Sequence, residues 1–160
     1  KNVTDQSYEQ LRQYIFNLRQ PNMQNISFRK LLTDFSSHIE STFFKCVLDL
    51  PDEIPALFDS AEIKSHLFSL TKEAVNNCIK HSGASKITIG IQKQDNGKII
   101  YFIEDNGKGI ISDDGSIESH HSSGIRIMEE RALLTGGHLN IISGEGNGTK
   151  ITVVYDGDKS

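Results

Sequence analysis

Cysteine is scarce in this chain of 160 residues, which contains only Cys46 and Cys78. The two lie far apart and form no metal-binding or redox spacing, which excludes a cysteine cluster and favours a reduced, cytoplasmic compartment. No run of about 18 apolar residues is present, so neither a membrane-spanning helix nor direct membrane contact is predicted. No signal peptide is visible either.

Positive charge is also limited, because 17 Lys and Arg stand against 21 Asp and Glu, and no basic cluster occurs. The net charge of −4 argues against non-specific nucleic-acid binding. The chain has no P-loop, no Gly-x-Ser-x-Gly segment and no Ser/His/Asp or Cys/His arrangement. Its composition, 36% apolar and 24% charged, fits one soluble globular domain with a short appendage. Because the chain begins with Lys1 rather than Met, we expect a piece of a longer protein.

Two helices are predicted before residue 42. The first has a 3-4-3 seam and ends near Pro21, because proline cannot continue a helix. The second has one apolar face, with Ser27 as its N-cap. The seam consists of Tyr8, Leu11, Ile15 and Leu18, and the second face of Phe28, Leu31, Leu32, Phe35 and Ile39.

The rest of the chain is predicted to form a layered α/β domain from about residue 40, with strands mostly joined by hairpins. A single long helix is expected from Ala61 to His81, and Asp95-Asn-Gly97 is a strong hairpin signal. A later helix should stop at Gly136-Gly137. Strands are predicted at 43–50, 86–93, 98–104, 138–143 and 149–155, a mobile loop at 110–122 and the later helix at 124–135.

The first candidate site is a polar face on the 61–81 helix. Glu73, Asn76, Asn77, Lys80 and His81 recur at helical spacing, opposite the apolar stripe. A carboxylate and an amide one turn apart can orient a hydrated Mg²⁺, and a lysine one turn further can reach a phosphate. Taken alone, the same pattern is more often a solvated helix face.

The second candidate is Asp105-Asn-Gly107-Lys-Gly109, which follows an apolar strand. A carboxylate at a strand end can accept a hydrogen bond from the exocyclic amine that adenine has and guanine lacks at that position. The glycines allow the backbone to approach a flat ligand closely. Taken alone, this segment and Gly146-Asn-Gly148-Thr149 are also compatible with plain turns.

Ser122-Ser123-Gly124 is predicted to open a helix, and the free N–H groups there can bind phosphate. A plain serine N-cap is the simpler alternative. Neighbouring His120 and His121 point apart on an extended loop, so a metal site is not expected there.

Taken together, the order of these segments resembles the Bergerat-fold (GHKL) ATPases, the family of gyrase, Hsp90, histidine kinases and MutL. The boxes are Glu73–His81 (Asn box), Asp105–Gly109 (first glycine box), Ser122–Arg131 (second) and Gly146–Thr149 (closing). Sensor histidine kinases of the nitrate-sensor and DesK-like subfamily are most similar, because of Lys80-His81-Ser-Gly-Ala and Met128-Glu-Glu-Arg131-Ala. Ser122 and Ile127 stand where the second glycine box usually has glycine.

The resemblance implies the Bergerat fold, an α/β two-layer sandwich. Its sheet is mixed and largely antiparallel, with helices on one face, and a short helical segment precedes it. The expected divisions are the end of a dimerisation helix at 1–22, a connecting helix at 23–42, the ATP-binding catalytic domain at 43–156 and a tail at 157–160.

The resemblance also implies a role for each site residue. Asn77 would ligate Mg²⁺, and Glu73 would act catalytically by orienting the metal or the attacking group. Asp105 would bind the adenine amino group, with Thr149 supporting it through water. The remaining nucleotide-binding residues would be Lys80, His81, Gly107, Gly109, Ser122, Ser123, Gly124 and Ile125, and residues 110–123 would form the lid over the phosphates.

The function implied is the catalytic domain of a two-component sensor histidine kinase, with ATP and Mg²⁺ as cofactors. The acceptor would be a histidine outside this chain, on the protein's own dimerisation domain, and a response regulator would then receive the phosphoryl group. The resemblance further implies a homodimer whose full-length form can be anchored in the bacterial cell membrane. The alternatives are an anti-sigma-factor serine kinase of the same fold and a degenerate nucleotide-binding scaffold.

Overall fold

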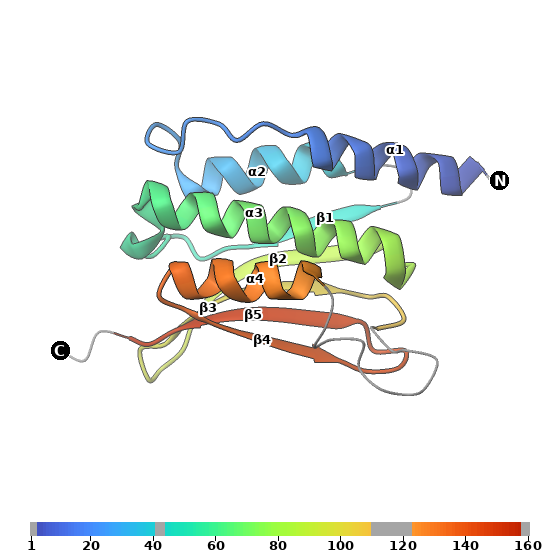
Figure 1. Ribbon diagram of the computed structural model, residues 1–160. Helices are drawn as coiled ribbons and strands as arrows, with labels where there is room; N and C mark the ends of the chain where they lie inside the picture. Colours follow the sequence, from blue (N-terminus) through green and yellow to red (C-terminus); the bar gives the residue numbers. More distant parts are fainter. Residues whose placement is uncertain (1–2, 41–43, 110–122, 158–160) are drawn as a thin grey trace.

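The computed structural model describes residues 3–40, 44–109 and 123–157, and in these ranges it has one five-stranded sheet (Figure 1). The strand order is β1-β2-β3-β5-β4. Only β1 and β2 are parallel, and the three other neighbouring pairs are antiparallel. The strands are β1 Lys45–Asp49, β2 Lys86–Lys93, β3 Ile99–Asp105, β4 His138–Ser143 and β5 Thr149–Tyr155.

The helices lie together on one face of this sheet (Figure 1). They are α1 Val3–Asn17, α2 Phe28–Ile39, α3 Ala61–Asn77 and α4 Ser123–Leu134, with a short 3-10 helix, η1, at Ala56–Asp59. This arrangement confirms the predicted two-layer α/β fold with a mixed, largely antiparallel sheet and a helical segment before it. No helix among the described residues is long and apolar enough to cross a membrane.

The connections between strands differ from the prediction that hairpins would predominate. Hairpins join β2 to β3 and β4 to β5, as the Asp95-Asn-Gly97 and Gly146/Gly148 turns indicated. The other two connections pass through helices, since α3 lies between β1 and β2 and α4 between β3 and β4. Parallel neighbours such as β1 and β2 need a crossover of this kind, because a tight turn reverses the chain and can join only antiparallel strands.

Helix α2 forms because its apolar residues share one face, and the structure confirms that face as buried. The side chain of Ser27 accepts a hydrogen bond from the backbone N–H of Lys30, as expected of an N-cap. The Phe28 ring stacks on Phe58 with centroids 5.0 Å apart, and both rings contact Tyr101 of the sheet. The helical layer and the sheet therefore share a single aromatic core.

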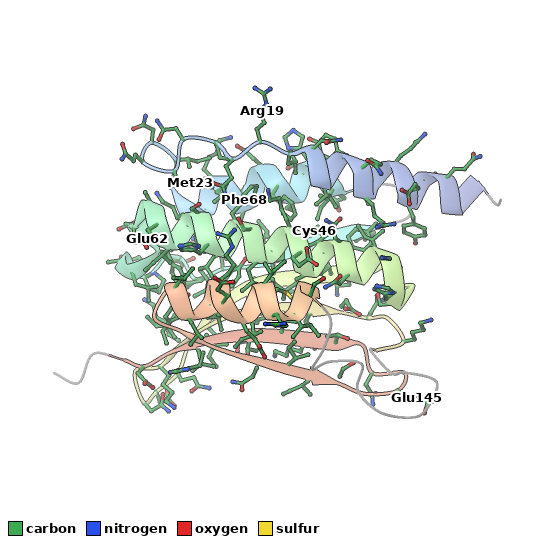
Figure 2. The ribbon with its side chains drawn as sticks, viewed as in Figure 1. Arg19, Met23, Cys46, Glu62, Phe68 and Glu145 are labelled. Atoms are coloured by element: carbon green, nitrogen blue, oxygen red, sulfur yellow. The ribbon has the colours of Figure 1, made fainter. Side chains whose placement is uncertain are left out.

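The segment between α1 and α2 is hydrogen-bonded to α3. Gln20 donates to Ser69 Oγ at 3.0 Å, and the buried Lys64 ammonium donates to the carbonyl of Ile26 at 2.7 Å. Figure 2 shows Met23 on the side of this connection that faces α3 and Arg19 pointing away from it. Helices α1 and α2 and the segment between them thus share the core with the sheet, while the domain divisions at 22 and 42 stay predictions.

The prediction of a single helix from Ala61 to His81 is wrong at the C-terminal end. The α-helix stops at Asn77, and Cys78–Ser82 form a π-helical turn, η2. The Ser82 hydroxyl donates to the Cys78 carbonyl at 2.6 Å, and Gly83 ends the turn with φ of +61°. The wider turn re-aims the last side chains of the helix, a feature that recurs at functional sites.

Candidate functional site

A cavity of about 240 Å³ lies between the end of α3, η2, the end of β3, the start of α4 and the start of β5. Ten of the twelve residues predicted for the site line it, so segments far apart in the sequence converge on one place. They are Glu73, Asn77, Lys80, His81, Asp105, Gly109, Ser123, Gly124, Ile125 and Thr149.

Two predicted residues remain, Gly107 and Ser122. Gly107 does not line the cavity, but its backbone N–H donates to the Asp105 carboxylate at 2.8 Å. Ser122 falls outside the described residues, as do His120, His121 and all of the predicted lid at 110–123 except Ser123, the first residue of α4. Asn76, which shares the polar pattern of the helix, is not a lining residue, and its buried Oδ1 has no hydrogen-bond partner.

Asp105 is placed by the sheet itself. It is the last residue of β3, where it pairs with Ile87 of β2 and with Thr149 of β5. Its carboxylate accepts a hydrogen bond from the backbone N–H of Gly107 at 2.8 Å. Burial raises the pKa of Asp105 above its ordinary value, and hydrogen bonding to the backbone offsets only part of this rise. The result is a mostly buried acceptor at the cavity wall.

The Gly146–Gly148 turn closes against the loop that follows Asp105. Gly148 has φ of +70°, and a Cβ there would lie 1.9 Å from the Asp105 carbonyl oxygen. The Gly146 N–H donates to the Lys108 carbonyl at 3.1 Å, and the Ser143 hydroxyl lies 3.0 Å from Thr149 Oγ1. Glycine is therefore needed at 148 because two stretches of backbone meet there.

The first turn of α4 lies against the polar face of α3. A Cβ on Gly124 would be 2.4 Å from Glu73 Oε1 and 3.4 Å from Asn77 Nδ2. The free N–H groups of a helix start and a carboxylate–amide pair thus share one end of the cavity. No group of three or more His, Cys, Asp or Glu that could hold a metal by itself occurs among the described residues.

Sequence reasoning missed five lining residues, Ala74, Cys78, Ser82, Met128 and Ile151. Ala74 and Cys78 belong to the apolar stripe of the predicted 61–81 helix and Ile151 to a predicted strand, where nothing in the sequence distinguishes a cavity wall from a core contact. Met128 served only as part of the motif that carries the resemblance. Ser82 stands in the Lys80-His81-Ser-Gly-Ala motif but was given no role at the site. Its place follows from the π-turn, and a Cβ on Gly107 would lie 2.5 Å from the Ser82 side chain.

The sequence matches the family of histidine kinase-, DNA gyrase B- and HSP90-like ATPases over residues 62–158, more than half of the chain. It is 30% identical over 155 residues to the sensor histidine kinase LiaS of Bacillus subtilis, covering 96% of this chain and 41% of LiaS. It is 37% identical over 91 residues to the sensor protein VraS of Staphylococcus aureus, covering 57% of this chain and 25% of VraS. The chain thus spans less than half the length of these relatives.

Solved structures share the fold. The histidine kinase domain of the Erythrobacter litoralis EL346 blue-light activated histidine kinase superposes with a TM-score of 0.63 at 17% identity, covering 98% of this chain and 76% of that one. Full-length ShkA in complex with AMPPNP gives 0.62 at 12% identity, covering 94% and 35%. The sensor-kinase relatives do not favour the anti-sigma-factor alternative. The chain therefore belongs to the histidine kinase-, DNA gyrase B- and HSP90-like ATPases and is a catalytic ATP-binding domain of the sensor histidine kinase type.

Proposed function

We propose that this domain transfers the γ-phosphoryl group of Mg-ATP to a histidine outside residues 1–160, from which a response regulator receives it. One observation carries the proposal: a buried carboxylate acceptor and a carboxylate–amide pair line the same cavity, and a helix start lies against the pair. The carboxylate suits adenine, and the pair with the helix start suits a metal-bound triphosphate.

The adenine amino group donates to Asp105, with the Ser143–Thr149 hydroxyl pair supporting that wall. Asn77 offers an amide oxygen and Glu73 a carboxylate toward Mg²⁺, which would neutralise phosphate charge when bound. Since these two side chains are too few to fill an octahedral shell, phosphate oxygens and water would supply the other ligands. Lys80 and His81, at the rim of the cavity, face the phosphates.

The chemical step breaks the bond between the γ-phosphorus and the oxygen that leaves with ADP, and it forms a phosphorus–nitrogen bond to the acceptor imidazole. Positioning and charge neutralisation supply most of the catalysis in such a transfer. No histidine of this chain is followed by an acidic residue that could take up the imidazole proton. We therefore assign the acceptor histidine to a dimerisation segment of a longer protein. That protein would be a homodimer, can be anchored in the cell membrane and would hold this domain on the cytoplasmic side.

The test is incubation with γ-labelled ATP and Mg²⁺, with and without a longer form of the protein that carries upstream helices and Asp105→Asn. We expect no label on the 160-residue domain alone and acid-labile, base-stable label on the longer chain when both are mixed. The transfer should be weak, because the tether that raises effective concentration is missing.

Acid-labile label on the isolated domain would place the acceptor within these 160 residues and overturn the assignment. Absence of transfer although ATP binds would instead favour the degenerate scaffold. A further variant, Asn77→Ala, should weaken Mg-ATP binding while leaving metal-free ADP largely unaffected, and equal weakening of both would contradict its role at the metal.

A further inference from the structure

Ser143, the last residue of β4, contacts a residue of the cavity wall without lining the cavity itself. It pairs across the sheet with Thr149, the first residue of β5, which does line the cavity. The part-buried Ser143 hydroxyl makes two contacts there. Ser143 Oγ lies 3.0 Å from Thr149 Oγ1 and 3.3 Å from the carbonyl oxygen of Gly148. Any effect of this hydroxyl on a ligand is therefore exerted through its neighbours.

The two contacts together decide which hydroxyl donates to the other. A carbonyl oxygen can only accept, so the contact with Gly148 needs the single hydroxyl proton of Ser143. Either oxygen could donate in the contact between Ser143 and Thr149. Because the Ser143 proton is already used, both contacts are hydrogen bonds only if Thr149 donates to Ser143. The Thr149 proton is then directed away from the cavity, and its lone pairs are left for a ligand.

We propose that Ser143 is a positioning residue that holds the Thr149 hydroxyl as an acceptor toward the ligand and thereby adds to the preference for a 6-amino over a 6-oxo purine. The inference rests on the proposed binding of adenine by Asp105. Thr149 is the partner of Asp105 across β3 and β5, and both residues line the cavity. With its proton bound to Ser143, Thr149 presents a second acceptor beside the carboxylate.

Two acceptors side by side match an amino group, which has two protons to donate. They repel the 6-oxo oxygen of hypoxanthine or guanine, which has none. A water between protein and base gives the same preference, because it would donate its protons to the carboxylate and the hydroxyl and turn a lone pair to the base. Without the Ser143 hydroxyl, Thr149 can rotate and donate to a 6-oxo oxygen. The direction of one proton thus contributes to the choice of base.

The turn beside Ser143 is also held by contacts that do not involve this hydroxyl. The Gly144 N–H donates to the Gly148 carbonyl at 3.4 Å, and the Gly146 N–H donates to the Lys108 carbonyl at 3.1 Å. Strands β4 and β5 pair along their whole length from His138 to Ser143. Removal of the Ser143 hydroxyl should therefore redirect a proton while the turn keeps its backbone contacts.

The chain offers closely matched variants for this test. Ser143→Val and Ser143→Thr share one shape and differ only in the hydroxyl, and Ser143→Ala serves in case a branched side chain disturbs the strand. Thr135→Val is the control, because Thr135 makes the same kind of arrangement away from the cavity. Its buried hydroxyl donates to the Ala132 carbonyl at 2.6 Å and lies 2.8 Å from the hydroxyl of Tyr155 on β5.

The measurement is calorimetric titration of ADP at neutral pH, alone and with IDP present as a competitor, so that weak IDP binding still gives a value. We expect Ser143→Val and Ser143→Ala to lower the ratio of ADP to IDP affinity about three- to tenfold, the range of one net hydrogen bond. Ser143→Thr and Thr135→Val should keep the wild-type ratio. In a Thr149→Val background, Ser143→Val should leave the ratio unchanged, because no hydroxyl is left to direct.

A wild-type ratio in Ser143→Val and Ser143→Ala, with ADP still bound, would overturn the inference and leave the proposed function intact. Equal weakening of ADP and IDP would do the same, since it is the result of a structural role alone. A change of the ratio that persists in the Thr149→Val background would also contradict the inference. If the wild-type domain binds no ADP, the proposed function itself fails.

Discussion

Substituting Gly148 by alanine tests the close approach between the β4–β5 turn and the Asp105 loop. A Cβ at this position would lie 1.9 Å from the Asp105 carbonyl oxygen, where real Cβ contacts do not fall below 3.0 Å. The two stretches of backbone must therefore move apart by at least the difference, 3.0 − 1.9 = 1.1 Å. Such a shift pulls Thr149 away from Asp105, its partner across β3 and β5.

Gly146→Ala is the matched control, two residues earlier in the same turn. Its φ of +72° is almost that of Gly148, but a Cβ there meets nothing within 4 Å. Both variants carry the cost of a left-handed alanine, about 1–2 kcal/mol, partly offset by about 0.4–1 kcal/mol from the restricted unfolded chain. Only Gly148→Ala adds the steric cost, which for overpacking is about 1–3 kcal/mol.

Urea unfolding and ADP calorimetry measure the two consequences. Gly148→Ala should be less stable than Gly146→Ala by about 1–3 kcal/mol. It should also bind ADP at least about tenfold more weakly, because a hydrogen bond to a charged group is displaced. If the two variants match in both stability and affinity, the backbone contact does not shape the site and the reasoning is refuted.

Three further outcomes are expected. Asp105→Asn should raise the unfolding temperature of the nucleotide-free protein at pH 7. Burial raises the folded-state pKa of this carboxyl, so the carboxyl lowers stability once the pH exceeds its unfolded-state pKa. An unchanged or lower unfolding temperature would contradict this. Gly90→Ala should destabilise by about 1–3 kcal/mol in urea yet keep ADP affinity, since its Cβ would meet the Phe102 ring at 2.4 Å, away from the cavity. Burial raises the pKa of Tyr155 from 10.0 to about 12, so stability should fall with pH across that window, and Tyr155→Phe should flatten the fall despite losing its 2.8 Å bond to Thr135.

Local chemistry made much of the fold predictable from the sequence. The strands at 138–143 and 149–155 were predicted with the bounds that the structure has, because turn glycines frame each of them. Ser27 was recognised as a cap because its hydroxyl acts on the next turn of its own helix. These features depend on residues a few positions apart, which a sequence displays directly.

Features that depend on distant contacts were not predictable in the same way. The π-turn at Cys78–Ser82 is tied to the Asp105 loop through the Lys108 N–H, which donates to the Ser82 carbonyl at 2.9 Å. The parallel pairing of β1 with β2 likewise needs the whole crossover to fold. Cys78 fits the apolar stripe of the 61–81 helix, and only the folded position of β3 puts it on the same cavity wall as Asp105.

The most direct test of the account is calorimetric titration of ADP and GDP into the wild-type domain and into Asp105→Asn at pH 7. The central claim is that the cavity recognises adenine through the Asp105 carboxylate. ADP should bind one site and GDP should not bind detectably, and Asp105→Asn should lose about 1–3 kcal/mol of ADP binding, roughly five- to 150-fold in affinity, while remaining folded. Equal affinity for ADP and GDP, or an unchanged ADP affinity in Asp105→Asn, would contradict it.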